Sequence, residues 1–223
     1  MPKTLFITGA STGIGAATAR AAVKAGWNVG LMARSADKLD TLTAELGDAA
    51  LALSGDATDL AAQQDAVRRT VDRFGALDAA FANAGTGLDK PGTEGGDPEE
   101  WRKLVDLNVM GVLYTARAAL PELRKTRGHL LLTGSAAGRN HIKGSIYSAS
   151  KWFVHGYAGN MSEEMRDWGG RCTLISPGMV DTPFFDEAKP DKLKPEDIAG
   201  AVMFAISQDP RAEVREVHVM PTG

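Results

Sequence analysis

Short apolar runs alternate along the chain with longer segments in which apolar residues recur at helical spacing. The apolar runs have the length of buried strands, and they are Thr4–Thr8, Val29–Ala33, Ala50–Leu53, Leu77–Ala82, His129–Thr133, Cys172–Ser176 and Val217–Met220. The segments with helical spacing are Ala16–Ala25, Lys38–Leu46, Leu60–Phe74, Pro98–Arg124, Tyr147–Trp168 and Pro195–Ser207. Strands that alternate with helices predict a parallel sheet with helices on both faces. We therefore expect an α/β fold that is Rossmann-like and doubly wound around a seven-stranded parallel sheet.

The alternation fills the chain from end to end. Its 223 residues contain no linker, internal repeat or low-complexity segment, so we expect a single domain over residues 1–223. Two irregular stretches, Gly85–Gly96 and Pro177–Pro195, follow predicted strands. Because ligands bind at the carboxyl ends of the strands in such folds, both stretches are expected to border the ligand site.

Composition narrows the class of protein. Hydrophobic residues make up 43% of the chain and charged residues 24%, as in ordinary globular proteins, and the net charge of −3 offers no basic surface for nucleic acid. The single cysteine, Cys172, excludes an intramolecular disulfide and fits a reducing compartment. The amino terminus lacks a signal-peptide pattern, and no apolar stretch has the length of a membrane span. We therefore expect a cytoplasmic protein with no nucleic-acid, membrane or metal partner.

Tyr147 and Lys151 lie four residues apart at the start of a predicted helix. This spacing places both side chains on one helix face. An ammonium group beside a phenol favours the phenolate, so Lys151 is expected to lower the pKa of Tyr147 towards neutrality and make it a general acid/base. Taken alone, the pair is a weak signal and fits an ordinary exposed helix better, because this spacing is frequent by chance.

A glycine-rich turn follows the first predicted strand. It reads Gly9-Ala-Ser-Thr-Gly13-Ile-Gly15 and opens a helix. Glycines let a backbone turn sharply and approach a ligand, and the helix amino terminus offers free N–H groups to a pyrophosphate. The position of the turn in the α/β pattern favours dinucleotide binding over a loop kept only for tight packing.

These residues belong to a longer series that resembles the short-chain dehydrogenase/reductase family over essentially the whole chain. The series contains Thr8–Gly15, the Asn83-Ala84-Gly85 triplet, Asn108, Ser135, Tyr147, Lys151, and Pro177-Gly178 followed by Thr182. The resemblance implies an NAD(P)-dependent oxidoreductase that interconverts an alcohol and a carbonyl, with Asn108, Ser135, Tyr147 and Lys151 as the catalytic residues. It further implies that the cofactor is bound by Gly9, Ser11, Thr12, Gly13, Ile14, Gly15, Arg34, Asp56, Asn83, Ala84, Gly85, Tyr147, Lys151, Pro177, Gly178, Val180 and Thr182.

The resemblance also implies a role for each catalytic residue. Tyr147 would donate a proton to the carbonyl oxygen, which Ser135 would stabilise and orient. Lys151 would tune Tyr147 and bind the nicotinamide ribose, and Asn108 would hold a water that links Lys151 to solvent. Outside this series, Ser135 would read as a turn residue and Asn108 as a helix residue bonded to a backbone carbonyl.

The end of the second predicted strand indicates which dinucleotide is bound. NAD-binding proteins of this fold place an acidic residue there, whereas this chain has Arg34 and Ser35 and no carboxylate before Asp37. A guanidinium suits a phosphate, so NADP is favoured and NAD is the alternative. Arg34 could instead stack on the adenine. Asp56 resembles the residue that meets the adenine amino group, and its alternative role is to satisfy local backbone N–H groups.

The chain departs from the family pattern in three places. Ala82 replaces the first Asn of the usual Asn-Asn-Ala-Gly motif, and the carboxyl terminus lacks the usual Val-Asp-Gly-Gly-like ending. The segment after Gly178 is short, so the substrate pocket should be open, with Phe184 and Phe185 either covering it or packing on the body of the protein. His141 could line this pocket or be only solvated.

Surplus apolar residues on two predicted helices suggest an oligomer. Pro98–Arg124 and Tyr147–Trp168 carry apolar residues on more than one side, and family members pair these helices, so we expect a homodimer or homotetramer. Two other functions fit the chain less well. A regulatory dinucleotide-binding protein has no use for an acid/base tyrosine, and a sugar-nucleotide epimerase of the extended type needs a larger carboxyl-terminal region.

Overall fold

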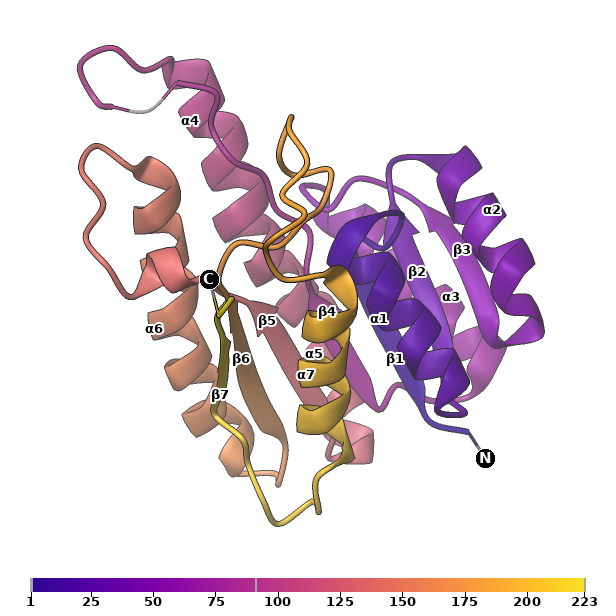
Figure 1. Ribbon diagram of the computed structural model, residues 1–223. Helices are drawn as coiled ribbons and strands as arrows, with labels where there is room; N and C mark the ends of the chain where they lie inside the picture. Colours follow the sequence, from indigo (N-terminus) through magenta and orange to yellow (C-terminus); the bar gives the residue numbers. More distant parts are fainter. Residues whose placement is uncertain (1, 91, 223) are drawn as a thin grey trace.

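The computed structural model of the chain describes residues 2–90 and 92–222, and it contains one seven-stranded sheet (Figure 1). The strands are β1 (Thr4–Thr8), β2 (Asn28–Ala33), β3 (Ala50–Ser54), β4 (Ala79–Ala82), β5 (His129–Thr133), β6 (Arg171–Pro177) and β7 (Glu216–Val219). They are ordered β3-β2-β1-β4-β5-β6-β7, and every neighbouring pair is parallel. The predicted Rossmann-like sheet is confirmed.

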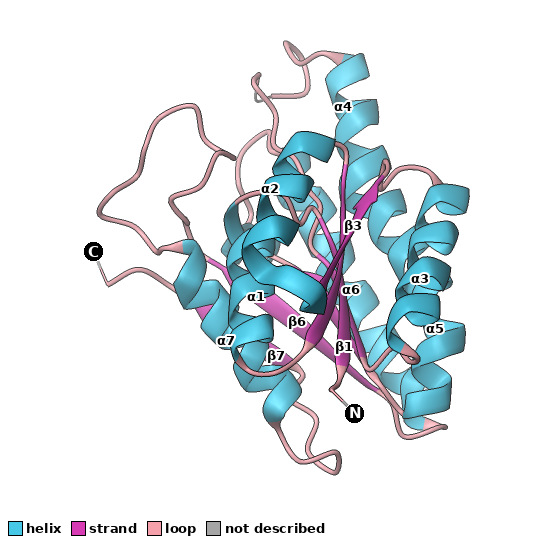
Figure 2. Ribbon diagram, turned by 90° about the vertical axis from the view of Figure 1, so that its right-hand side faces the viewer, coloured by secondary structure: helices cyan, strands magenta, loops and turns pink. Residues whose placement is uncertain are grey.

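Helices cover both faces of this sheet, as Figure 2 shows. They are α1 (Gly13–Lys24), α2 (Ala36–Leu46), α3 (Leu60–Phe74), α4 (Pro98–Val105), α5 (Gly111–Thr126), α6 (Ile146–Arg166) and α7 (Pro195–Ser207). On one face α1, α2 and α7 pack around Leu5 and Ile7, and on the other α3, α5 and α6 pack around Phe6. The alternation of side chains along β1 thus supplies both apolar layers. The strand order reverses between β1 and β4, and a fold of this kind has its ligand crevice at that point.

The predicted helix Pro98–Arg124 is not continuous. It consists of α4, a π-helical turn over Asp106–Met110, and α5. A π turn adds one residue to a helix and leaves the apolar spacing on either side of it nearly unchanged. The apolar pattern alone therefore predicts one long helix. The largest of the remaining boundary shifts is at α1, which begins at Gly13 rather than at Ala16. None of the helices in the described ranges has an apolar stretch long enough to cross a membrane.

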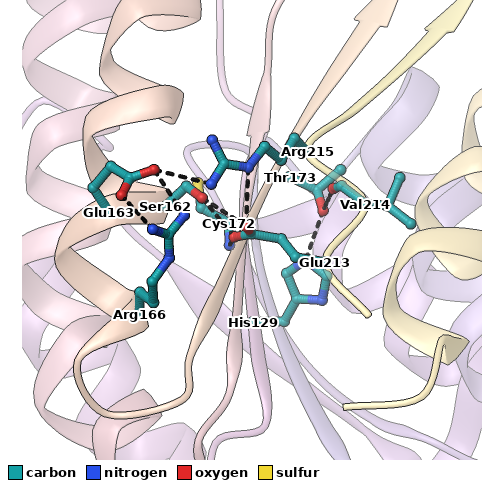
Figure 3. Close-up of polar contacts among 9 residues, drawn as sticks. All are labelled: His129, Ser162, Glu163, Arg166, Cys172, Thr173, Glu213, Val214 and Arg215. Atoms are coloured by element: carbon teal, nitrogen blue, oxygen red, sulfur yellow. Dashed lines mark hydrogen bonds and ion pairs between the residues drawn. The ribbon is translucent and has the colours of Figure 1, made fainter. Parts of the chain in front are cut away.

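Polar contacts fix the amino end of β6 to its neighbours (Figure 3). The Glu213 carboxylate accepts hydrogen bonds from the Ser162 hydroxyl at 2.7 Å and from the Cys172 backbone N–H at 3.1 Å. The Thr173 hydroxyl donates to the Val214 carbonyl, and the His129 ring nitrogen Nε2 lies 2.7 Å from the same hydroxyl. These contacts hold α6 and the segment before β7 on the sheet at the edge opposite the ligand crevice.

Candidate active site

A cleft of about 1610 Å³ lies at the carboxyl edge of the sheet, and the segment that joins β6 to α7 (orange in Figure 1) contributes part of its lining. Most of the predicted site residues line it: Gly9, Ser11, Thr12, Gly13, Ile14, Arg34, Asp56, Asn83, Ala84, Gly85, Ser135, Tyr147, Lys151, Pro177, Gly178, Val180 and Thr182. The other two, Gly15 and Asn108, are buried behind its wall. The fold therefore brings together residues that are separated by up to 173 positions in the sequence, from Gly9 to Thr182.

The glycine turn after β1 is packed so tightly that side chains do not fit. A Cβ atom on Gly15 would lie 2.3 Å from the Gly9 carbonyl oxygen, and one on Gly9 would lie 2.8 Å from the Cα atom of Ala84. Gly9 and Gly13 also have positive φ angles of 65° and 53°, which L-residues with side chains rarely adopt. The turn consequently presents bare backbone to the cleft.

The turn is fastened to the neighbouring strands by Asn83. Its side-chain amide donates to the carbonyls of Thr8 and Gly9 at 3.1 and 3.3 Å, and its oxygen accepts from the Thr133 hydroxyl at 3.3 Å. The backbone N–H of Asn83 donates to the Thr8 hydroxyl at 3.1 Å. Asn83 thus joins the ends of β1, β4 and β5 and holds the floor of the cleft in place.

Helix α1 points its amino terminus into the cleft without a cap of its own. Thr12, the N-cap residue, makes no side-chain capping bond, and the first turn contains no acidic residue. In contrast, side chains of Asp59, Asp97 and Ser145 cap α3, α4 and α6. Uncapped N–H groups and an uncompensated helix dipole suit an anion. The turn and the helix terminus therefore fit the pyrophosphate of a dinucleotide.

Tyr147 and Ser135 face each other at the other end of the cleft. Tyr147 stands in the first turn of α6, where the Ser145 hydroxyl caps the helix by accepting from the Ser148 N–H at 3.0 Å. Burial raises the pKa of Tyr147 above its ordinary value, and a hydrogen bond with Ser135 opposes this effect. The expectation that Lys151 lowers the pKa of Tyr147 is wrong for this structure, because desolvation of the phenol dominates.

Lys151 is almost completely buried, with 4% of its surface exposed. Its Nζ donates to the Thr133 carbonyl at 2.8 Å and lies 5.8 Å from the centre of the Tyr147 ring. The two side chains therefore share a helix face, as the spacing predicts. Burial lowers the pKa of Lys151 to about 8, because it takes the charged ammonium group out of water.

Asn108 is fully buried in the π-helical turn between α4 and α5. Its side-chain oxygen accepts from the Thr86 N–H at 2.8 Å, and its amide nitrogen donates to the Thr86 carbonyl at 2.9 Å and to the Ser150 hydroxyl at 3.3 Å. The side chain is thus bonded to a backbone carbonyl, which was the alternative reading of this residue. Gly85, in the loop after β4, packs between Asn108 and Lys151. A Cβ atom added to Gly85 would lie 3.3 Å from Asn108 Oδ1 and 3.7 Å from Lys151 Nζ.

Ser148 was missed by the sequence analysis, although it follows Tyr147 directly. It is buried, and its hydroxyl lies 2.8 Å from the Ala137 carbonyl and 3.1 Å from the Asn140 carbonyl. Ala137 belongs to the short 3₁₀ helix that follows Ser135, so this contact connects the serine turn to the tyrosine helix. Gly138, in the same 3₁₀ helix, packs directly against α6. A Cβ atom added to Gly138 would lie only 2.7 Å from the Lys151 carbonyl oxygen.

Arg34 lies at the opposite end of the cleft, after β2. It is exposed, and its guanidinium makes no hydrogen bond or ion pair with any described residue. Lys38, on the first turns of α2, lines the cleft as well and was missed because it reads as an ordinary helix lysine. The N-cap residue of α2, Ser35, makes no side-chain capping bond, so its hydroxyl and the helix amino terminus complete a cationic, donor-rich corner.

Asp56 lines the same end of the cleft, yet its carboxylate is already engaged. One oxygen accepts from the backbone N–H and the hydroxyl of Thr58, both at 2.9 Å. This local turn is the alternative role considered for Asp56. Its contact with an adenine stays a prediction.

The segment after β6 places Phe184 in the cleft, beside Tyr147. Phe184 is exposed, whereas Phe185 is half-buried behind it, so only the first of the two aromatic residues presents a free surface. His141 does not line the cleft, and its ring stacks on Trp152 at 5.5 Å.

Three comparisons with known proteins agree with this geometry. The family model of the short chain dehydrogenases matches residues 3–193. An uncharacterized oxidoreductase from Staphylococcus saprophyticus is 37% identical over 98% of this chain and 97% of its own length.

Among solved structures, the alcohol dehydrogenase from the archaeon Thermococcus sibiricus, complexed with 5-hydroxy-NADP, superposes with a TM-score of 0.91. It is 30% identical and covers 100% of this chain and 97% of that one. The 3-ketoacyl-(acyl-carrier-protein) reductase from Brucella melitensis, complexed with NADH, has a TM-score of 0.89 at 28% identity and covers 97% and 96% of the two chains.

Proposed function

Because the chain belongs to the short chain dehydrogenase family of oxidoreductases, we propose that it interconverts an alcohol and a carbonyl with a nicotinamide dinucleotide, and that NADP(H) is preferred over NAD(H). The observation that carries the proposal is the meeting of Ser135, Tyr147 and buried Lys151 at one end of a cleft whose other end is an uncapped helix terminus. A dinucleotide has both a reactive ring and a pyrophosphate, and the cleft offers a place for each. A regulatory protein that only bound the dinucleotide would have no use for an acid/base tyrosine beside that lysine.

The residues fit the dinucleotide at three points. Backbone N–H groups of the Gly9–Gly15 turn would bind the pyrophosphate, and Lys151 would donate to the nicotinamide ribose. Residues 177–182 would flank the nicotinamide ring. When bound, the cofactor supplies or accepts the hydride.

Tyr147 is proposed as the general acid. As hydride reaches the carbonyl carbon, negative charge develops on the oxygen, which takes the proton of the Tyr147 hydroxyl and is stabilised by a hydrogen bond from Ser135. The ammonium of Lys151 favours the phenolate that remains, although burial opposes it. Without cofactor, the raised pKa of Tyr147 keeps its hydroxyl protonated. The protonated hydroxyl is the form that reduction requires.

Arg34 and Lys38 support the preference for NADP. Their two cations border the cleft where the second strand ends, and the nearest carboxylate in the sequence after Arg34 is Asp37, which lies in α2. A 2′-phosphate would pair with the free guanidinium of Arg34. Among structures similar to this chain, the Thermococcus enzyme is complexed with an NADP derivative and the Brucella enzyme with NADH, so the choice of dinucleotide has to be argued from this chain's own residues.

The cofactor preference is tested with Arg34→Ala. A charge-assisted contact at an exposed site is worth about 1.5–3 kcal/mol, so KM for NADPH should rise by about ten- to a hundredfold while KM for NADH barely changes. Arg211→Ala, an exposed arginine at the opposite edge of the sheet, is the matched control. Equal weakening of both cofactors, or a wild type that already prefers NADH, would assign Arg34 to adenine stacking instead.

The activity itself is tested by following NADPH absorbance with ketones, aldehydes, β-keto esters and quinones. We expect oxidation of NADPH with at least one carbonyl class. Tight binding of NADPH without turnover across the whole panel would favour the regulatory alternative.

A further inference from the structure

Large apolar side chains that line the cleft are left exposed. Met179, Phe184 and Met220 are 41%, 44% and 51% exposed, and all three line the cleft. Met220 and Gly178 are in contact, since a Cβ on Gly178 would lie 3.0 Å from the Met220 sulfur. Apolar surface that gathers inside a concave site indicates an apolar ligand.

Phe184 is held directly beside the acid/base tyrosine. The centres of the Phe184 and Tyr147 rings are 5.8 Å apart, and the Phe185 ring supports Phe184 edge-on at 5.1 Å. Across the cleft, Gly87 leaves room for the Phe184 ring, because a Cβ there would lie 3.1 Å from its Cζ atom. A group attached to a carbonyl at Tyr147 would therefore meet an aromatic face.

The segment that carries Phe184 is braced at its base. Asp181 accepts hydrogen bonds from the Lys189 N–H and the Lys194 ammonium, both at 2.8 Å, and the Phe184 N–H donates to the Thr182 hydroxyl at 3.3 Å. An isolated β-bridge joins Val180 to Leu193. The segment is thus anchored to the rest of the fold on either side of Phe184.

Two carboxylates lie close in sequence to the residues that form this wall of the cleft. Asp89 follows Gly87 and Leu88 along the loop after β4, and Asp186 follows Phe185; both line the cleft. Four cationic side chains are among the described lining residues. Arg34 and Lys38 are at the opposite end, Lys151 is buried and donates to the Thr133 carbonyl, and Lys103 stands on α4.

We propose, on the basis of the proposed function, that the carbonyl substrate is electrically neutral and carries an aromatic or comparably bulky apolar group, and that keto acids are poor substrates. In the reduction, the carbonyl carbon gains a hydride from the reduced cofactor and the oxygen gains the Tyr147 proton, which gives the alcohol. The substituent would pack on Phe184 and the two methionines. A carboxylate would be repelled by Asp89 and Asp186, whereas a neutral group would not.

Three compounds separate charge from size. Benzoylformamide and benzoylformate have the same ring and ketone and nearly the same shape, but only the second is charged. Pyruvamide keeps the amide and lacks the ring. We expect kcat/KM to be highest for benzoylformamide, by about tenfold or more over each of the other two, because like charges and a lost apolar contact each have effects of that size.

The compounds also differ in intrinsic reactivity. This difference cancels when the same ratio of kcat/KM values is compared between the wild type and a variant. In Asp89→Asn with Asp186→Asn, the preference for benzoylformamide over benzoylformate should shrink severalfold. In Phe184→Ala, the preference for benzoylformamide over pyruvamide should shrink, whereas Phe204→Ala, an exposed phenylalanine on α7, should leave it unchanged.

The outcomes distinguish this inference from the function on which it rests. Turnover of benzoylformate as fast as that of benzoylformamide, with a ratio that the aspartate variants do not move, overturns the substrate class and leaves the oxidoreductase intact. If no compound turns over, fluorescence titration with NADPH decides: binding without turnover overturns the substrate class, and no binding overturns the proposed function as well.

Discussion

Replacing Lys151 by methionine should stabilise the protein while it destroys the proposed activity. Lys151 is 4% exposed, and burial lowers its pKa from 10.5 to about 8. A difference of this size corresponds to about 3 kcal/mol of unfavourable burial of the charged form. Methionine keeps the length and the packing of the side chain without the charge.

The net gain is smaller than the burial term. The Thr133 carbonyl loses its hydrogen bond from Lys151 Nζ, at a cost of about 1 kcal/mol. We therefore expect the free energy of unfolding of Lys151→Met to exceed that of the wild type by about 2 kcal/mol at pH 7. For a chain of this length, the gain corresponds to a rise in Tm of about 4–8 °C.

The pH dependence identifies the cause of the gain. Below pH 8 the lysine is protonated in both the folded and the unfolded wild type, so the full cost of burial is present. Between about pH 8 and 10.5 the folded state loses the proton first, the unfolded state binds more protons, and the stability of the wild type rises with pH. The advantage of Lys151→Met should therefore be constant below pH 8 and should shrink above it.

Urea unfolding without cofactor, at pH 7 and at pH 9.5, measures this difference. Lys143→Met, at an exposed lysine in the loop before α6, is the control and should change stability by less than about 0.5 kcal/mol. A Lys151→Met protein that is less stable than the wild type at pH 7, or whose advantage does not depend on pH, would refute the reasoning.

Three further predictions concern the sheet, the glycine turn and assembly. His129 is buried with its Nδ1 unpartnered, and burial lowers its pKa to about 3, so the wild type should lose about 2 kcal/mol of stability between pH 7 and pH 5 as the unfolded state takes up the proton. In His129→Gln this loss should be absent from urea unfolding curves, whereas His218→Gln, at an exposed position, should keep it. Gly15→Ala should weaken NADPH binding by at least about tenfold in fluorescence titration, because the new Cβ displaces the turn. Gly159→Ala is the control, because α6 leaves open space at that position, and it should not change NADPH binding. If both variants weakened NADPH binding equally, the packing argument would be contradicted. Trp152 and Phe153 are both 41% exposed on α6, and this apolar surface predicts a dimer or tetramer. Phe153→Glu should dissociate the oligomer in light scattering at micromolar concentration. A wild type that is monomeric under the same conditions would exclude the oligomer.

The sheet could be predicted from the sequence because each buried strand is a short apolar run. Strands such as His129–Thr133 and helices such as Leu60–Phe74 have the expected bounds, since apolar periodicity and a capping residue such as Asp59 mark them directly. The π turn at Asp106–Met110 could not be predicted, because one extra residue in a helical turn leaves the apolar pattern nearly unchanged.

The candidate site was predicted from motifs, but its energetics were not. Spacing alone places Tyr147 and Lys151 on one face of α6, and the structure has them there. The direction of the Tyr147 pKa depends on how deeply the phenol is buried, which no local pattern records, and the prediction was therefore wrong. For the same reason the sequence did not indicate Ser148, whose role depends on two carbonyls, those of Ala137 and Asn140, brought close only by the fold.

The central claim is that Tyr147 supplies the proton in a carbonyl reduction, and Tyr147→Phe tests it most directly. Phenylalanine keeps the ring beside Phe184 and loses only the hydroxyl. With a carbonyl compound that the wild type reduces, NADPH oxidation should fall by about two to four orders of magnitude, while NADPH binding measured by fluorescence titration stays nearly unchanged. Turnover by Tyr147→Phe at a rate close to that of the wild type would contradict the claim and remove Tyr147 from the mechanism.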